Sequence, residues 1–202
     1  MARGPRYNLP FRRKREGRTD YKKRIRLVLS RIPRLVIRPT NKHIIVQLIE
    51  AKPEGDLILV SSSSSDLKKR YKWKAGCGNL PAAYLTGLMA GYKAIQKGSK
   101  RAVLDMGLHI SSKGSRIYAA LKGVLDAGIE VPHGEGILPD EDRIKGRHIS
   151  EYAKKLSDDP ELYNKHFSDY VSGGFDPKQL PEHFDDIKEK IVQEISKVKA
   201  EA

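Results

Sequence analysis

Residues 34–60 read RLVIRPTNKHIIVQLIEAKPEGDLILV, and this stretch decides the fold. It contains three segments rich in Ile, Val and Leu, at 34–38, 43–50 and 57–60. The turn-forming sequences PTNK at 39–42 and KPEGD at 52–56 separate them. Short segments of this composition between such turns are typical of β-strands. The stretch therefore predicts an antiparallel three-stranded meander.

Beyond residue 75 the pattern changes to alternating helices and strands. One helix is predicted from Asn79 or Leu80 to Gly98, with Pro81 in its first turn, and another over 115–127 with Gly128 as its stop. Residues 102–106 between them read as a short buried strand. Strand, helix and strand in this order imply a right-handed parallel crossover. We therefore expect an α/β fold in which the meander and the crossover share one mixed sheet flanked by helices.

The C-terminal part of the chain is predicted to be helical. Residues 132–146 look like a loop, and short helices follow it, with a start signal at Asp159-Pro160 and a longest piece from Pro181 towards Lys199. One face of that piece is apolar and carries Phe184, Ile187, Ile191, Ile195 and Val198. Such a face must pack on something, and the chain's own body and a partner protein suit it equally. We therefore expect a basic arm over 1–18, an α/β body over 19–131 and a loop and helical extension over 132–202.

The charge of the chain is strongly one-sided. The sequence has 39 Lys and Arg against 25 Asp and Glu, a net charge of +14, and residues 1–75 alone hold 21 basic and 6 acidic side chains. A one-sided positive field attracts a polyanion and releases the counterions condensed on its phosphates. A membrane surface is the weaker alternative, because the first 18 residues have only Leu9 and Phe11 as large aliphatic or phenyl groups. Nucleic acid is the predicted partner, with no membrane. We expect a soluble cytosolic protein, since no apolar run approaches the length of a membrane span.

Residues 1–18 are predicted to be an arm that stays disordered until it binds. Gly and Pro interrupt seven Arg and Lys there without any period, so the segment cannot build a core. Tyr7, Asn8 and Phe11 lie among the charges and are suited to stacking on exposed bases or bonding their edges. A solvated tail or an import-type basic tract is the plainer alternative.

A basic amphipathic helix is predicted from Thr19 or Asp20 to Ile32, where Pro33 ends it. One side should pack, through Tyr21, Ile25, Val28, Leu29 and Ile32. The other should meet phosphate, through Lys22, Lys23, Arg24, Arg26 and Arg31. An ordinary surface helix would explain the apolar stripe, but it would leave these five cations without an acidic partner.

Two further segments are predicted to contact nucleic acid. The first turn of the meander gathers polar groups suited to sugar and phosphate contacts, from Arg38, Thr40, Asn41, Lys42 and His43. A serine run at 61–65, which we interpret as a low-complexity loop, leads to the basic and aromatic sequence KKRYKWK at 68–74. We expect the latter to extend the same binding face.

No constellation in the sequence predicts catalysis, a metal or a cofactor. Gly76-x-Gly78 lacks the third glycine and the lysine-serine pair of a phosphate loop and is interpreted as a turn. The spacing Gly87-x-x-x-Gly91 should let its helix approach the sheet closely. Asp105, His109 and Ser111 lack the surroundings of a catalytic serine, no two of the six histidines have helical zinc spacing, and Cys77 is the one cysteine. We therefore predict a protein that is not an enzyme.

Several ordered blocks of the chain resemble the archaeal form of the large-subunit ribosomal protein family L-eighteen. They are GPRY at 4–7, RRKREGRTDY at 12–21, LVIR at 35–38, NKHI at 41–44, GNLPAAYLTG at 78–87 and LDMG at 104–107. The part after residue 130 resembles the extension of archaeal and eukaryotic members. The resemblance implies a constituent of the large ribosomal subunit, in the cytoplasm, that binds 5S rRNA in the central protuberance. Large-subunit rRNA and neighbouring ribosomal proteins would be its other partners, the latter through the C-terminal helices.

The same resemblance implies which residues contact RNA. These are Arg3, Arg6, Tyr7, Arg12, Arg13, Lys14, Arg15, Arg18, Tyr21, Arg38, Asn41, Lys42, His43, Lys69, Arg70, Lys72 and Trp73. The residue pattern itself adds Lys22, Arg24, Arg31, Arg34 and Thr40. A nucleic-acid-modifying enzyme, or a DNA-binding regulator with helix 20–32 in a major groove, would use the same basic face and is the rival interpretation.

Overall fold

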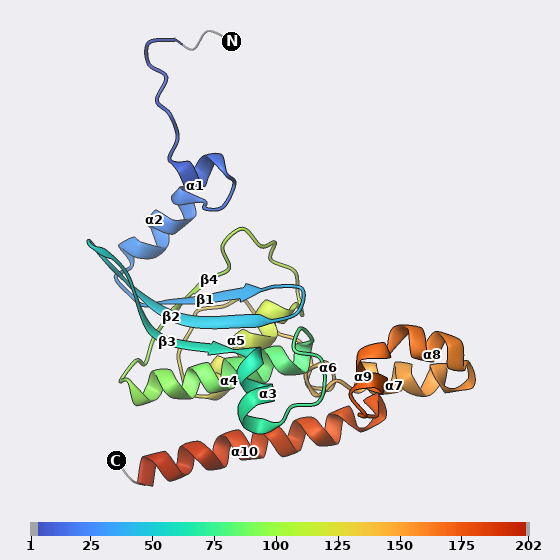
Figure 1. Ribbon diagram of the computed structural model, residues 1–202. Helices are drawn as coiled ribbons and strands as arrows, with labels where there is room; N and C mark the ends of the chain where they lie inside the picture. The colour runs from blue at the N-terminus through green and yellow to red at the C-terminus, as the bar shows by residue number, and fades with distance from the viewer. Residues whose placement is uncertain (1–3, 201–202) are drawn as a thin grey trace.

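One mixed sheet organises the protein, as the sequence predicts (Figure 1). The computed structural model describes residues 4–200, and over 195–200 only the course of the backbone. The strands are β1 (Arg34–Pro39), β2 (Ile44–Lys52), β3 (Gly55–Ser63) and β4 (Val103–Asp105). Their order is β3-β2-β1-β4, and β4 runs parallel to β1 while the other pairs are antiparallel. The meander and the parallel fourth strand are therefore both confirmed.

One face of the sheet is covered by α4 (Leu80–Gln96) and α5 (Arg116–Asp126), and this layer holds the main core. Alternate residues of β1 and β2, such as Leu35, Ile37 and Val46, point into it and are fully buried. The start of α4 is confirmed, because the Asn79 side chain accepts a hydrogen bond from the amide of Ala82 at 2.9 Å. The opposite face of the sheet carries no such layer, and α2 lies above it (Figure 1).

The two covering helices touch through their backbones. A Cβ added to Gly87 would lie 2.0 Å from the carbonyl oxygen of Ala120, and one added to Gly123 would lie 2.2 Å from that of Tyr84. Gly91 faces the same helix, 2.6 Å from the Cβ of Ala127 by the same measure. The prediction that Gly87 and Gly91 serve a close approach to the sheet is therefore wrong. They let α5 pack closely on α4.

The serine run is not a loop, which corrects another prediction. Ser61–Ser63 end β3, and Ser63 begins α3 (Ser64–Tyr71) with a reciprocal capping box to Asp66. The buried hydroxyl of Ser64 accepts a hydrogen bond from the amide of Ile44 at 3.0 Å. Serine hydroxyls satisfy backbone donors at helix starts, so a run of them marks a junction here.

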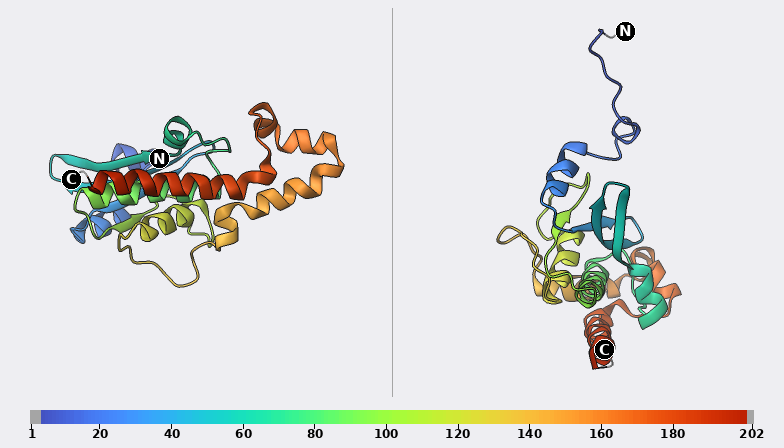
Figure 2. Two further views of the ribbon diagram at one scale, coloured as in Figure 1. Left: turned by 90° about the horizontal axis from the view of Figure 1, so that it is seen from below. Right: turned by 90° about the vertical axis from the view of Figure 1, so that its left-hand side faces the viewer.

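The C-terminal part forms short helices, as predicted, and its last helix packs on the chain itself. It comprises α6 (Glu141–Lys145), α7 (Arg147–Lys155), α8 (Pro160–His166), α9 (Ser168–Ser172) and α10 (Leu180–Ala200), with 3-10 turns at Leu156–Asp158 and Pro177–Gln179. Phe184, Ile187 and Ile191 of α10 are buried in a second apolar cluster with Leu85 and Leu88 of α4. Ile195 and Val198 lie outside the residues whose side chains are described. The apolar face of α10 is expected from the sequence to pack either on the chain's own body or on a partner protein. Its described side chains pack on the chain's own body (Figure 2).

Part of the segment expected to be a loop is helical. Asp140 lies at the N-terminus of α6, and Glu141 and Asp142 form its first turn. Acidic side chains stabilise a helix start, so this cluster is a helix signal that the loop assignment overlooked.

The outer edge of the sheet at β3 is covered by Lys93 of α4 and by Lys97, the residue that follows this helix. The ammonium of Lys97 donates to the carbonyl of Leu59 at 2.6 Å. The ammonium of Lys93 donates to the carbonyl of Ser61 at 3.4 Å and to the hydroxyl of Ser62 at 3.1 Å. These contacts occupy backbone acceptors on an edge strand.

In the described part of the chain, no helix combines the length and apolar character that crossing a bilayer requires. The same residues contain no group of three or more His, Cys, Asp or Glu side chains placed to hold a metal ion.

Candidate nucleic-acid interface

The N-terminal arm reaches away from the body (Figures 1 and 2), and the cations of its described part are exposed. Its one short helix, α1 (Arg12–Arg15), consists only of basic residues and buries none of them. Arg12 pairs with Glu16 at 2.8 Å, and Nε of Arg13 donates to the hydroxyl of Thr19 at 2.9 Å. Arg6, Tyr7 and Arg18 are also exposed, whereas Arg3 lies outside the described residues. The arm thus has no core of its own.

The helix α2 (Tyr21–Leu29) starts where predicted but packs less than expected. The carboxylate of Asp20 caps it by accepting from the amides of Lys22 at 3.0 Å and Lys23 at 3.2 Å. It ends at Leu29 instead of Ile32, because Arg31 adopts a left-handed backbone with φ of 55°. None of its residues is buried, and Leu29 is 74% exposed. The predicted packing is therefore wrong for Ile25, Leu29 and Ile32, which are exposed, while Tyr21 and Val28 are half-buried.

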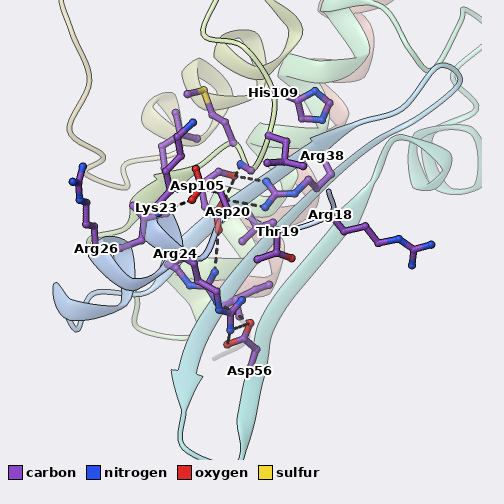
Figure 3. A pocket seen from close by; sticks show the side chains of 18 of the residues that line it. Arg18, Thr19, Asp20, Lys23, Arg24, Arg26, Arg38, Asp56, Asp105 and His109 are labelled. Atoms are coloured by element: carbon purple, nitrogen blue, oxygen red, sulfur yellow. Dashed lines mark hydrogen bonds and ion pairs between the residues drawn. The ribbon is translucent and has the colours of Figure 1, made fainter. Parts of the chain in front are cut away.

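An ion-pair ladder, Arg24–Asp56–Arg34–Asp105–Arg38, joins α2 to the sheet (Figure 3). Both carboxylate oxygens of Asp56 lie 2.9 Å from a guanidinium nitrogen of Arg24, and the next rung, Arg34 to Asp56, is 2.8 Å. The rungs from Asp105 to Arg34 and to Arg38 are each 2.9 Å. The ladder carries alternating charges from the helix across the open face of the sheet.

The two carboxylates of the ladder remain charged well into acid. Burial by itself would raise the pKa of Asp105, but the hydrogen bond and charge of Arg38, with the amide of Gly107 and the charge of Arg34, hold the pKa below the ordinary value of 3.8. The same balance, with Arg24 and Arg34 as donors, lowers the pKa of Asp56. Both acids therefore neutralise ladder arginines at neutral pH.

Two predicted RNA contacts are corrected by burial. Arg34 is 3% exposed, and its guanidinium is engaged by Asp56 and Asp105, so it serves the ladder. Trp73 is 2% exposed, its ring stacks on His183 at a centroid distance of 5.0 Å, and its Nε1 donates to the carbonyl of Gly76. A tryptophan among cations resembles a base-stacking residue in sequence, yet this one belongs to the second apolar cluster.

The turn between β1 and β2 presents its polar side chains outward. The hydroxyl of Thr40 donates to the carbonyl of His43 at 2.8 Å and closes the turn, while Asn41, Lys42 and His43 are exposed. Two residues that the sequence did not single out for this site hold it. Arg116 donates to the carbonyls of Thr40 and Gly78, each at 3.0 Å, and a Cβ on Gly78 would lie 2.7 Å from the carbonyl oxygen of Asn41.

The second basic stretch lies on the other side of the sheet from α2. Helix α3 packs on α4 and α10 and so belongs to the helix-covered side (Figure 1). Lys69 and Arg70 on α3, and Lys72 at its left-handed C-terminus, are exposed. The stretch does not lie under α2, but the hydroxyl of Ser64 at the start of α3 lies 3.5 Å from Nδ1 of His43, so the stretch adjoins the turn 39–43. That it extends the binding face of this turn stays a prediction. We call the basic regions the arm surface (α1, α2 and the turn 39–43) and the α3 surface, which meet at the turn.

Comparison with known proteins decides the family. The family model described as "Ribosomal large subunit proteins 60S L5, and 50S L18" matches residues 5–100 and 92–134. The chain belongs to this family. The L18-family chain is also 51% identical to the large ribosomal subunit protein uL18 of Staphylothermus marinus, over all 202 residues and the whole of that protein.

Family membership confirms the expected class of protein. An L18-family chain is a structural constituent of the large subunit of the ribosome, which works in the cytoplasm, and it is not an enzyme. The rival readings as a modifying enzyme or a DNA-binding regulator are not favoured by these matches.

Proposed function

We propose that this L18-family chain binds 5S rRNA and helps to attach it to the large-subunit rRNA in the central protuberance. The observation that carries the proposal is the arrangement of the positive charge. Residues 1–75 hold 21 of the 39 cations, and exposed ones are carried by α1 and α2 above the sheet and by α3 below it. A protein that joins two RNA molecules needs a phosphate-binding surface for each of them.

The residues proposed to contact RNA are those on the two surfaces whose side chains reach solvent. On the arm surface they are Arg6, Tyr7, Arg12, Arg13, Lys14, Arg15, Arg18, Tyr21, Lys22, Arg31, Thr40, Asn41, Lys42 and His43, together with the outer parts of Arg24 and Arg38. On the α3 surface they are Lys69, Arg70 and Lys72. Arg3 stays a prediction. Shape should govern recognition, because side chains cannot read the deep, narrow major groove of an RNA helix.

The three segments of the chain would bind different partners. The arm over 1–18 and the body over 19–131 would hold RNA, and the extension over 132–202 would meet neighbouring ribosomal proteins. The extension has 16 acidic and 11 basic side chains, so its charge repels RNA and suits basic proteins. Tyr152, Leu162 and Val171 on its short helices are exposed apolar groups that fit such a contact.

Affinities for deproteinised 5S rRNA, transfer RNA and duplex DNA, measured at one fixed salt concentration, test the proposal. We expect the tightest binding to 5S rRNA, because general attraction to phosphate is shared by all three polyanions and a fitted shape is not. Equal affinity for 5S rRNA and duplex DNA would refute it.

A further inference from the structure

A cleft lies between α2 and the open face of the sheet, and no side chain of the described residues fills it (Figure 3). Its volume is about 560 Å³, within the range of sites that hold one small molecule. Val36, Ile49, Leu104 and Met106 form an aliphatic floor supplied by the sheet and the residue after β4. Leu27 of α2 lines the cleft from above. The cleft therefore offers a flat apolar group a place between two aliphatic surfaces.

The rim of this cleft is cationic and its acids are already engaged. Asp56 and Asp105 are neutralised by the ladder, and Asp20 is occupied in capping α2. Lys23 and Arg26 stand at the rim, and no acidic partner for either is found in the described part of the chain. An anionic group with an apolar portion is the ligand that such a site favours.

One hydrogen-bond donor in the wall of the cleft has no partner in the ion-pair ladder. Nε of Arg34, which lines the cleft, is buried and has no hydrogen-bond acceptor among the described atoms. A buried donor without an acceptor is costly, so an incoming acceptor near this wall would be stabilised. Because α2 buries no residue and Arg24 is its one member of the ion-pair ladder, little packing opposes a shift of this helix that would admit a group beneath it.

We propose that this cleft receives one unpaired nucleotide of the bound rRNA, with its base on the aliphatic floor and its phosphate on Lys23 and Arg26. The inference rests on the proposed function and adds a specific subsite to it. A nucleotide combines a flat ring, base-edge acceptors and an anionic phosphate, which match the floor, the Arg34 wall and the rim. Paired nucleotides do not enter, because their bases are stacked inside a helix too wide for the cleft.

A matched pair of substitutions on one helix tests the subsite. Leu27→Trp fills the cleft from above, while Ile25→Trp places the same bulk on α2 at a residue that is 57% exposed and does not line the cleft. Neither change removes a cation, and α2 has no buried residue whose packing could be lost. Melting temperatures and circular dichroism of both variants should match the wild type. Lys23→Gln, a rim variant that leaves the floor intact, provides an independent measurement.

The probes are deproteinised 5S rRNA and deproteinised large-subunit rRNA. We expect Leu27→Trp to weaken binding to one of them about tenfold, Lys23→Gln about threefold and Ile25→Trp less than twofold, since a seated base contributes on the order of one stacked nucleotide. Chemical probing of all four bases should reveal an unpaired base that wild type protects and Leu27→Trp leaves reactive.

The results separate this inference from the proposed function. If wild type binds 5S rRNA but Leu27→Trp binds both RNAs as tightly and protects the same bases, the subsite is wrong while the proposed function stands. If Leu27→Trp binds RNA normally but fails to enter ribosomal subunits, a protein segment occupies the cleft and the inference is also overturned. If wild type shows no preference for 5S rRNA, the proposed function itself fails.

Discussion

Removing the four cations of α1 should flatten the salt dependence of RNA binding by a calculable amount. The change is Arg12, Arg13, Lys14 and Arg15 to alanine, which suits a helix and disturbs no packing, because α1 buries nothing. Each phosphate contact contributes about 0.7 to 0.9 to the slope of log affinity against log salt. Arg12 is already paired with Glu16, so about three contacts count and the slope should fall by about 2 to 3. At physiological salt this corresponds to roughly a hundredfold weaker binding.

Filter binding to 5S rRNA over a series of salt concentrations measures this slope. The control variant replaces Lys154 and Lys155, two exposed cations of α7 on the acidic extension, and should keep the wild-type slope. A quadruple variant whose line runs parallel to that of wild type would refute the role of the arm, even if its absolute affinity were lower.

Three further predictions concern the ladder, the helix pair and the turn. Asp105→Asn should lower the free energy of unfolding by about 2 to 3 kcal/mol, since buried Arg34 keeps only one acid, and urea denaturation that shows less than about 0.5 kcal/mol would contradict it. The pKa of Asp105 in the folded protein lies below 3.8, so its contribution to stability is complete above the pKa of the unfolded state and is lost as the pH falls through the folded-state pKa. The free energy of unfolding of the variant should therefore fall less steeply than that of wild type as the pH is lowered. Gly87→Ala should cost about 3 kcal/mol or more, because its methyl group would meet a carbonyl at 2.0 Å; an unchanged melting temperature would show that α5 moves away freely. Lys42→Ala should weaken binding to 5S rRNA several-fold at an unchanged melting temperature, whereas Arg38→Ala should lower that temperature through the ladder; equal thermal effects would contradict this assignment.

Local signals predicted most of the fold. The meander follows from the spacing of its apolar segments and turns, and the starts of α2, α4 and α8 follow from Asp20, Asn79 and Asp159, whose side chains accept from amides of the first turn. These features depend on residues within one turn of each other. Sequence reasoning resolves such short-range effects well.

Most of the errors involve contacts between distant segments, whereas the serine run at 61–65 and the acidic start of α6 carry local helix signals that the predictions overlooked. Trp73 is buried by His183, which lies 110 positions away, and Arg34 by Asp105, 71 positions away. The apolar stripe of α2 predicts a packed helix, but the ion-pair ladder joins this helix to the sheet, and Ile25, Leu29 and Ile32 of the stripe stay exposed. Gly87 faces a helix and not the sheet, which its spacing alone could not distinguish. Composition identifies the candidate RNA-binding segments, but only tertiary structure divides them between two surfaces.

The lysines that cover β3 affect how readily the protein aggregates before it binds RNA. A ribosomal protein is made apart from its RNA, and an open strand edge in that interval would let one chain add to the sheet of another. With Lys97 and Lys93 bonded to the carbonyls of Leu59 and Ser61, a foreign strand must first displace two ammonium groups and then face their charge. These contacts therefore disfavour edge-to-edge association of newly synthesised copies before they assemble into the ribosomal subunit.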